Sequence, residues 1–147
     1  MTNQQDGRCH CGSIRYQLID EPIMVEYCHC DSCRRLSGSV VSTFAGYRRE
    51  SFTLIEGEPV YYRSSPGVRR SFCGKSGTRL FFESDDYPQE IYISVGTLRD
   101  FKTWPPDRHV WVSDKVSWHM IGDNLAQYAA FSGSGAAAEG IPYKKPG

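Results

Sequence analysis

Three cysteines fall within six residues of this chain, and their spacing constrains the fold more than any other feature of the sequence. Cys28, Cys30 and Cys33 form a Cys-x-Cys-x-x-Cys run. The remaining cysteines are the upstream pair Cys9 and Cys11 and the lone downstream Cys73. Short cysteine runs are typical of metal-binding turns, because neighbouring thiolates can reach one ion. We therefore expect the chain to fold around bound metal.

The composition fits a cytoplasmic domain of ordinary size. The chain has 147 residues, which is enough for one domain with its own core. Lys+Arg and Asp+Glu both total 17, and this neutral balance argues against a nucleic-acid partner. No apolar run approaches the roughly 20 residues of a membrane span, and the first residues do not resemble a signal peptide. We therefore expect no membrane partner and, in a reducing cytoplasm, thiols rather than disulfides.

Hydrophobic alternation predicts a mostly β fold. Ile14, Tyr16 and Leu18 alternate with polar residues, which is the period of a half-buried strand. Glycine and proline turns separate further strands predicted at residues 23–28, 40–45, 52–56, 60–63, 68–72, 79–83, 91–95 and 110–112. Since no long segment has helical periodicity, we expect many short antiparallel strands in one zinc-binding domain over residues 1–131.

The remaining segments are assigned by their polar and small residues. Residues 1–7 are polar and are expected to be loose. Residues 31–38 contain turn and cap residues and are expected to form one short helical turn. A small helix is predicted at residues 124–130, with Asp123 as its N-cap. Residues 132–147 begin with a low-complexity run and are expected to form a flexible tail.

Cys28, Cys30 and Cys33 are predicted to form an open zinc site. Residues two apart on an extended segment project from the same face, so Cys28 and Cys30 can converge, and the following Cys-x-x-Cys turn brings in Cys33. His29 is adjacent, but extended geometry turns it the other way. Three thiolates without a fourth protein ligand leave a zinc position free for chemistry. The alternative is a closed structural site completed by a distant residue.

Cys9, Cys11 and Cys73 are predicted to form a second, structural site that ties the N-terminal segment to a hairpin around Cys73. A second Cys-x-x-Cys would place its last thiolate at position 76, where this chain has Ser76. A serine hydroxyl is a poor zinc ligand, because it is harder than sulfur and ionises less readily. Three outcomes remain open: zinc held by three cysteines and an oxygen from Ser76, water or another side chain; weak zinc binding; or His10 as fourth ligand.

These segments resemble the glutathione-dependent formaldehyde-activating enzymes, carbon–sulfur lyases that share an Mss4-like fold with the centromere protein V group. The resemblance covers residues 7 to about 128 in the family's order. The matching segments are Gly7-Arg8-Cys9-His10-Cys11-Gly12 and Tyr16; Cys28-His29-Cys30-Asp31-Ser32-Cys33-Arg34-Arg35 and Gly38; Arg70-Ser71-Phe72-Cys73 and Gly77-Thr78-Arg79-Leu80-Phe81; and His109-Val110-Trp111-Val112-Ser113-Asp114 and Trp118.

The resemblance implies a β-rich fold with two Zn²⁺ sites. It casts Cys28, Cys30 and Cys33 as catalytic, and Cys9, Cys11, Cys73 and position 76 as structural. It implies a small thiol substrate such as glutathione or its adduct, because in the namesake reaction glutathione adds to formaldehyde. A non-catalytic zinc module that binds another protein is the main alternative. A chromatin binder is disfavoured by the zero net charge.

Three residues outside the cysteine runs are also assigned. Arg34 and Arg35 follow the cysteine run and could offset its negative charge or bind a substrate carboxylate. The alternative favoured for them is that they are solvated or pair with nearby acids. His109 is expected to be a hydrogen-bonded structural histidine rather than a ligand.

Overall fold

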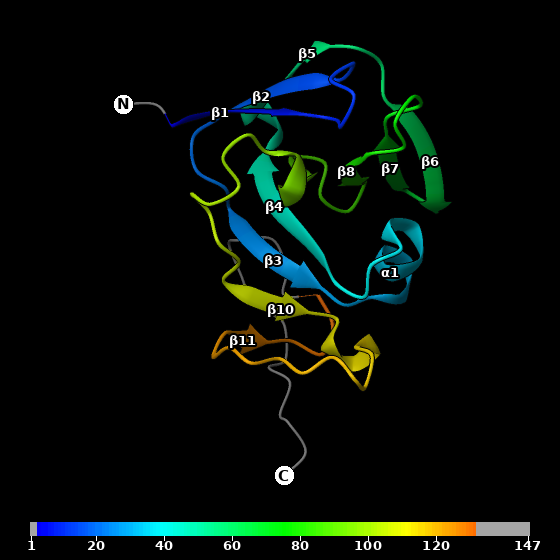
Figure 1. The fold of residues 1–147 in the computed structure, drawn as a ribbon, viewed down its shortest axis with the longest axis vertical. Helices are drawn as coiled ribbons and strands as arrows, with labels where there is room; N and C mark the ends of the chain where they lie inside the picture. The colour runs from blue at the N-terminus through cyan, green and yellow to red at the C-terminus, as the bar shows by residue number, and fades with distance from the viewer. Residues whose placement is uncertain (1–2, 132–147) are drawn as a thin grey trace.

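The computed structural model describes residues 3–131, which form two β-sheets and one short α-helix (Figure 1). The three-stranded sheet has the order β1 (Gln4–Arg8), β2 (Arg15–Ile19) and β5 (Phe52–Glu56). The eight-stranded sheet has the order β11 (Ala126–Gln127), β10 (Arg108–Val110), β3 (Met24–Cys28), β4 (Ser42–Arg48), β9 (Glu90–Ser94), β8 (Arg79–Ser84), β7 (Val68–Phe72) and β6 (Val60–Ser65). The helix α1 spans Asp31–Ser37, and three 3₁₀ turns span Arg49–Ser51, Val95–Thr97 and Val112–Asp114. The mostly β prediction is confirmed.

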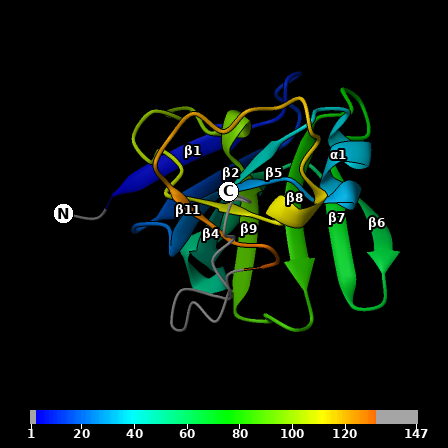
Figure 2. The same ribbon diagram turned by 90° about the horizontal axis from the view of Figure 1, so that it is seen from below.

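Most neighbouring strands pair antiparallel, as predicted. β6, β7, β8 and β9 follow one another as a meander, and β4 and β3 extend the sheet beyond β9. Only at the other end does the direction change, because β10 pairs parallel with β3 and β11 pairs parallel with β10. Figure 2 shows β7 and β8 side by side, with α1 at the end of the sheet near β6 and β7. The predicted hairpin around Cys73 is the β7–β8 pair.

The main core depends on the alternation in β2. Tyr16 and Leu18 are buried, whereas Arg15 and Ile19 are exposed. The Tyr16 ring meets Phe81 edge-on at 5.1 Å between centroids. The same ring lies over Gly7, where an added Cβ would be 2.0 Å from the Tyr16 ring. A glycine is therefore required at position 7 for the first strand to approach β2.

The prediction that residues 1–7 are loose is wrong for the described part of that segment. Gln4–Arg8 forms β1 and pairs antiparallel with β2, from Gln4 opposite Ile19 to Arg8 opposite Arg15. The segment has no apolar alternation, so periodicity did not reveal it. Main-chain hydrogen bonds to β2 and the fit of Gly7 under Tyr16 hold it instead.

The end of the described chain also differs from prediction. β10 ends at Val110, because Trp111 adopts a left-handed conformation with φ of 55° and begins a 3₁₀ turn, so residues 110–112 are not one strand. The predicted helix at residues 124–130 does not form. β11 lies there instead, and Asp123 accepts a hydrogen bond from the backbone N–H of Leu125 and contacts His109. Pairing with β10 has overridden a weak local helix signal.

Other predicted elements are present, including the helical turn after Cys30, which ends at Gly38 in the left-handed region. The predicted tail at residues 132–147 lies outside the described residues. Across residues 3–131, none of the helices has the length and apolar character needed to cross a bilayer.

Candidate functional site: two cysteine clusters and a pocket

The structure brings Cys28, Cys30 and Cys33 together at the junction of β3 and α1. Cys28 is the last residue of β3, Cys30 is the N-cap of α1, and Cys33 lies in the first turn of that helix. The Cys30 Sγ accepts a hydrogen bond from the Cys33 N–H at 3.2 Å. The three sulfurs lie within 4.8 Å of one another. Their number, softness and proximity suit a zinc ion, as the spacing predicted.

Two arginines that sequence reasoning missed lie against this cluster. Arg70 Nη1 donates to the Cys33 Sγ at 3.5 Å, and Arg79 Nη2 donates to the same sulfur at 3.8 Å. Arg79 Nη1 also donates to the Cys33 carbonyl at 3.1 Å. Hydrogen bonds from Cys28 and Cys30, followed by the Arg70 guanidinium, lower the pKa of Cys33. Both arginines come from the β7–β8 hairpin, so only strand pairing places them here.

Arg34 and Arg35 instead pair with an acid on their own helix. Arg34 Nη2 donates to Asp31 at 2.7 Å, and Arg35 Nε donates to the same carboxylate at 3.0 Å. Arg34 Nη1 also donates to the Asp114 carbonyl at 3.3 Å. The expectation that these arginines pair with nearby acids is confirmed by these contacts.

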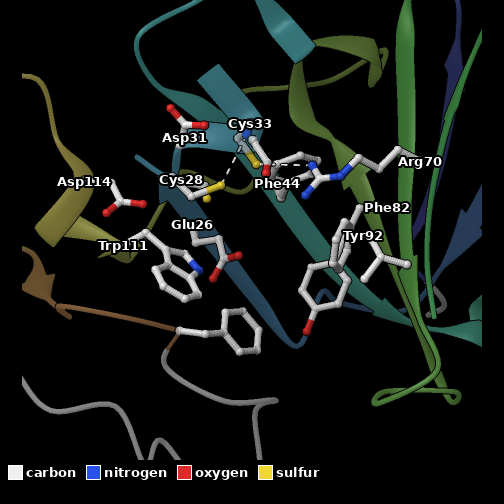
Figure 3. Close-up of a pocket in the computed structure, with 14 residues that line it drawn as sticks. Glu26, Cys28, Asp31, Cys33, Phe44, Arg70, Phe82, Tyr92, Trp111 and Asp114 are labelled. Atoms are coloured by element: carbon white, nitrogen blue, oxygen red, sulfur yellow. Dashed lines mark hydrogen bonds between the residues drawn. The ribbon is translucent and has the colours of Figure 1, made fainter. Parts of the chain in front are cut away.

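A cavity of about 320 Å³ adjoins the three cysteines, all of which line it (Figure 3). Its walls include five aromatic side chains: Phe44, Phe82, Tyr92, Trp111 and Phe131. Cross-strand register explains how they meet, because Phe44 lies opposite Glu26, and Phe82 lies opposite both Tyr92 and Arg70. Side chains opposite one another in a sheet share a face. The pocket is therefore built on one face of the large sheet.

Glu26 is the unexpected member of this pocket. Its side chain points into the cavity between Trp111 and Tyr92 (Figure 3), and the residue is 4% exposed. Its Oε2 is buried and has no hydrogen-bond partner. Burial raises the pKa of the Glu26 carboxyl to about 8, although Arg108 opposes the shift. A sequence signal existed, since Glu26 precedes Cys28 by two residues on one predicted strand and so shares its face.

The raised pKa of Glu26 predicts a pH-dependent cost in stability. The folded pKa of about 8 lies above the ordinary value of 4.5, so the folded state retains a proton that the unfolded state releases. Between these pH values, stability relative to Glu26→Gln is expected to fall by roughly 1.4 kcal/mol per pH unit, and to level off above the folded pKa. Urea unfolding of both proteins at pH 5, 6.5 and 8 measures this difference. The same difference in unfolding free energy between the two proteins at all three pH values would contradict the prediction.

Cys9, Cys11 and Cys73 form the second cluster, as predicted. The Cys11 Sγ lies 3.6 Å from the Cys9 Sγ and 3.7 Å from the Cys73 Sγ. A tetrahedral zinc with bonds of about 2.3 Å would place neighbouring sulfurs about 3.8 Å apart. The spacing of these sulfurs therefore fits one zinc ion, and the cluster joins the turn after β1 to the β7–β8 hairpin.

The hydroxyl among these three sulfurs belongs to Ser13. Its Oγ lies 3.1 Å from the Cys11 Sγ, 3.4 Å from the Cys73 Sγ and 3.7 Å from the Cys9 Sγ. With a zinc–oxygen bond of about 2.1 Å, a fourth tetrahedral ligand would lie about 3.6 Å from each sulfur. Hydrogen bonds from Ser13, and then from Ser76, lower the pKa of Cys73 to about 5. Sequence reasoning missed Ser13 because it belongs to no Cys-x-x-Cys spacing.

Ser76, the predicted oxygen ligand, is also close to the cluster. Its backbone N–H donates to the Cys73 Sγ at 3.4 Å, while its Oγ lies 3.0 Å from the Thr78 Oγ1. The backbone N–H of the exposed His10 donates to the same Thr78 hydroxyl at 2.9 Å. The ligand role of Ser76 stays a prediction, and Ser13 has the geometry to compete for it.

A buried histidine pair connects the segment of Cys28, Cys30 and Cys33 to the last described segment. His29 Nε2 lies 2.9 Å from His109 Nδ1, and His109 Nε2 lies 2.9 Å from Asp123. The expectation that His109 is a hydrogen-bonded structural histidine agrees with these contacts. Burial, followed by the neighbouring His109, lowers the pKa of His29 to about 4. The lowered pKa keeps His29 neutral at neutral pH, and the His29–His109–Asp123 contacts connect β3 to the last described segment.

The fold and this site define a class: a mostly β protein with two thiol clusters suited to metal and an aromatic pocket beside one of them. The family described as glutathione-dependent formaldehyde-activating enzyme matches residues 4–114. The chain belongs to this family.

Two relatives extend the comparison. An uncharacterised lyase of Schizosaccharomyces pombe (strain 972) is 28% identical over 126 residues, covering 85% of this chain and 90% of that protein. A crystal structure of a Rhodobacter sphaeroides protein covers 65% of this chain and 88% of its own, with a TM-score of 0.56 and 22% identity. The second likeness concerns the fold alone.

Proposed function

We propose that this protein is a zinc-dependent carbon–sulfur lyase or synthase that acts on small thiol adducts. The observation that carries the proposal is the position of Cys28, Cys30 and Cys33 on the cavity wall. Within residues 3–131, no further His, Cys, Asp or Glu joins this group of ligands. A zinc ion with three protein ligands keeps a position for a substrate. Membership of the family and the lyase name of the fission yeast relative support the same activity.

The three cysteines would hold the ion, and zinc there would supply the Lewis acidity that stabilises a substrate thiolate near neutral pH. Arg70 and Arg79 would offset the negative charge of the thiolates, since both guanidinium groups contact the Cys33 sulfur. The aromatic walls would exclude water from the carbon that bonds to sulfur. The namesake reaction, addition of glutathione to formaldehyde, and its reverse are both consistent with this arrangement.

The test is NMR exchange spectroscopy of a thiol, formaldehyde and their S-hydroxymethyl adduct in the presence of zinc-loaded protein. Exchange is expected to accelerate in proportion to the loaded protein, to return to the spontaneous rate after chelation, and to recover when zinc is restored. Glutathione and a smaller thiol are compared under the same conditions. Spontaneous rates with both thiols on fully loaded protein would reject the lyase and favour the non-catalytic zinc module.

A further inference from the structure

One carboxyl oxygen of Glu26 has no hydrogen-bond partner among residues 3–131. This oxygen, Oε2, is buried and unpartnered, and the Glu26 side chain lines the cavity (Figure 3). A buried polar atom without a partner destabilises a fold, so natural proteins seldom retain one without a use. A ligand that donates a hydrogen bond would satisfy it.

The neighbours of Glu26 are committed elsewhere. The Tyr92 hydroxyl donates to Glu90 at 2.6 Å, and Arg108, opposite Glu26 on β10, donates to Asp107 at 2.8 Å. On the other side, β4 places the apolar Phe44 opposite Glu26. The donor that suits Glu26 therefore has to come from the occupant of the cavity.

The position of Glu26 beside the cysteine cluster suits one functional group of a thiol adduct. Glu26 and Cys28 lie two residues apart on β3, so their side chains share a face at a spacing of about 7 Å. If a substrate sulfur were bound beside the cysteines, a hydroxyl on the carbon bonded to it could point along this face toward Glu26. S-hydroxyalkyl adducts carry their hydroxyl at this carbon.

The charges of the cavity indicate what the rest of the adduct is like. Three carboxyl groups line it, those of Glu26, Asp31 and Asp114, and Arg34 and Arg35 pair with the carboxylate of Asp31. Arg70 is the one cation among the lining residues that the structure describes, and it already contacts Ser64, Cys33 and the Phe82 ring. The remaining wall is largely aromatic. An anionic substituent is therefore less suited to this cavity than a compact apolar one.

We infer that Glu26 is a specificity-determining residue, which accepts a hydrogen bond from the hydroxyl of an S-hydroxyalkyl adduct whose compact, apolar substituent packs on the aromatic walls. The inference rests on the proposed function, since it places the substrate sulfur at Cys28, Cys30 and Cys33. It narrows the substrate class from thiol adducts in general to small, uncharged ones.

Two stable thiols that differ by one hydroxyl test the inference: 2-mercapto-1-phenylethanol, whose hydroxyl is on the second carbon from sulfur and stands in for the labile hydroxyl of the adduct, and 2-phenylethanethiol. Their affinities are measured by calorimetry on zinc-loaded wild type, Glu26→Gln and Glu26→Leu. The wild type is expected to bind the hydroxylated thiol about tenfold more tightly than its partner, as one added hydrogen bond would give. Glu26→Gln should retain much of this preference, because its amide oxygen also accepts. Glu26→Leu should bind both thiols equally.

Two results would overturn the inference: equal binding of the two thiols by the wild type, or an unchanged hydroxyl preference in Glu26→Leu. Thermal unfolding verifies that each variant is folded, and Glu26→Met replaces Glu26→Leu if the latter is not. The exchange experiment on the same samples separates this inference from the proposed function. If the protein accelerates exchange but shows no preference for the hydroxylated thiol, only the role of Glu26 is rejected. If it shows a Glu26-dependent preference but does not accelerate exchange, only the lyase activity is rejected.

Discussion

Cys30→Ser is expected to lower thiol-dependent turnover by about a thousandfold or more, because removing one thiolate from a three-ligand zinc site removes most of the metal's stabilisation of the reacting sulfur. Cys30 is the best of the three positions to change. Its Sγ caps α1 by accepting from the Cys33 N–H, and serine is a preferred N-cap residue. The variant therefore loses a ligand while retaining the helix that carries Cys33.

Zinc content and turnover, measured on the same samples, check this prediction. Elemental analysis is expected to give about two zinc ions per chain for the wild type and about one for Cys30→Ser. Thermal unfolding serves as the control, and the variant should unfold close to the wild type because the second cluster is intact. Wild-type turnover by a variant that lacks this zinc ion would refute the catalytic assignment of the cluster.

Loss of metal from the second cluster is expected to destabilise the fold by several kcal/mol, because metal-binding free energy at a structural site is folding free energy. Cys11 and Cys73 are separated by 62 residues, and their sulfurs lie 3.7 Å apart. An ion there would fix the turn after β1 to the β7–β8 hairpin. Cys73→Ser should therefore unfold at much lower denaturant concentration than the wild type, and chelation should have little further effect on it.

Ser13 and Ser76 offer a matched pair of variants for identifying the fourth ligand. Ser13→Ala is expected to weaken zinc at this cluster by about tenfold to a hundredfold, because its Oγ lies within 3.7 Å of all three sulfurs, where a fourth ligand would be placed. Ser76→Ala removes a hydroxyl bonded to Thr78 and is expected to have a smaller effect. Ser76→Cys should bind zinc more tightly than the wild type, since thiolate is the softer ligand.

Competition with a chromophoric chelator measures these affinities for the more stable zinc ion of each protein. The ranking expected is Ser76→Cys above wild type, wild type above Ser76→Ala, and Ser13→Ala the weakest. If Ser76→Ala loses more affinity than Ser13→Ala, the oxygen ligand is Ser76, as the Cys-x-x-Cys spacing first predicted.

The clustering of the cysteines could be predicted from the sequence, but the residues that surround the clusters could not. Cys28, Cys30 and Cys33 meet because a strand and one helical turn bring them together locally. Arg70 and Arg79 reach Cys33 only through the register of the β7–β8 hairpin, far along the chain. Arg34 and Arg35 were candidates to offset the charge of the cysteines because they are close to them in sequence. In the structure, both arginines pair with Asp31 instead.

The sequence by itself determined the two cysteine clusters and the β class of this protein, because short cysteine spacings and period-2 alternation are short-range patterns. Only the tertiary structure decided that Glu26 and the cysteines line one cavity with aromatic walls, that Ser13 lies among the sulfurs of the second cluster, and that Gln4–Arg8 and Ala126–Gln127 are strands. Those features depend on which strands pair and in what register. Pairing is settled by packing and main-chain hydrogen bonds between distant segments, which leave no local pattern to read.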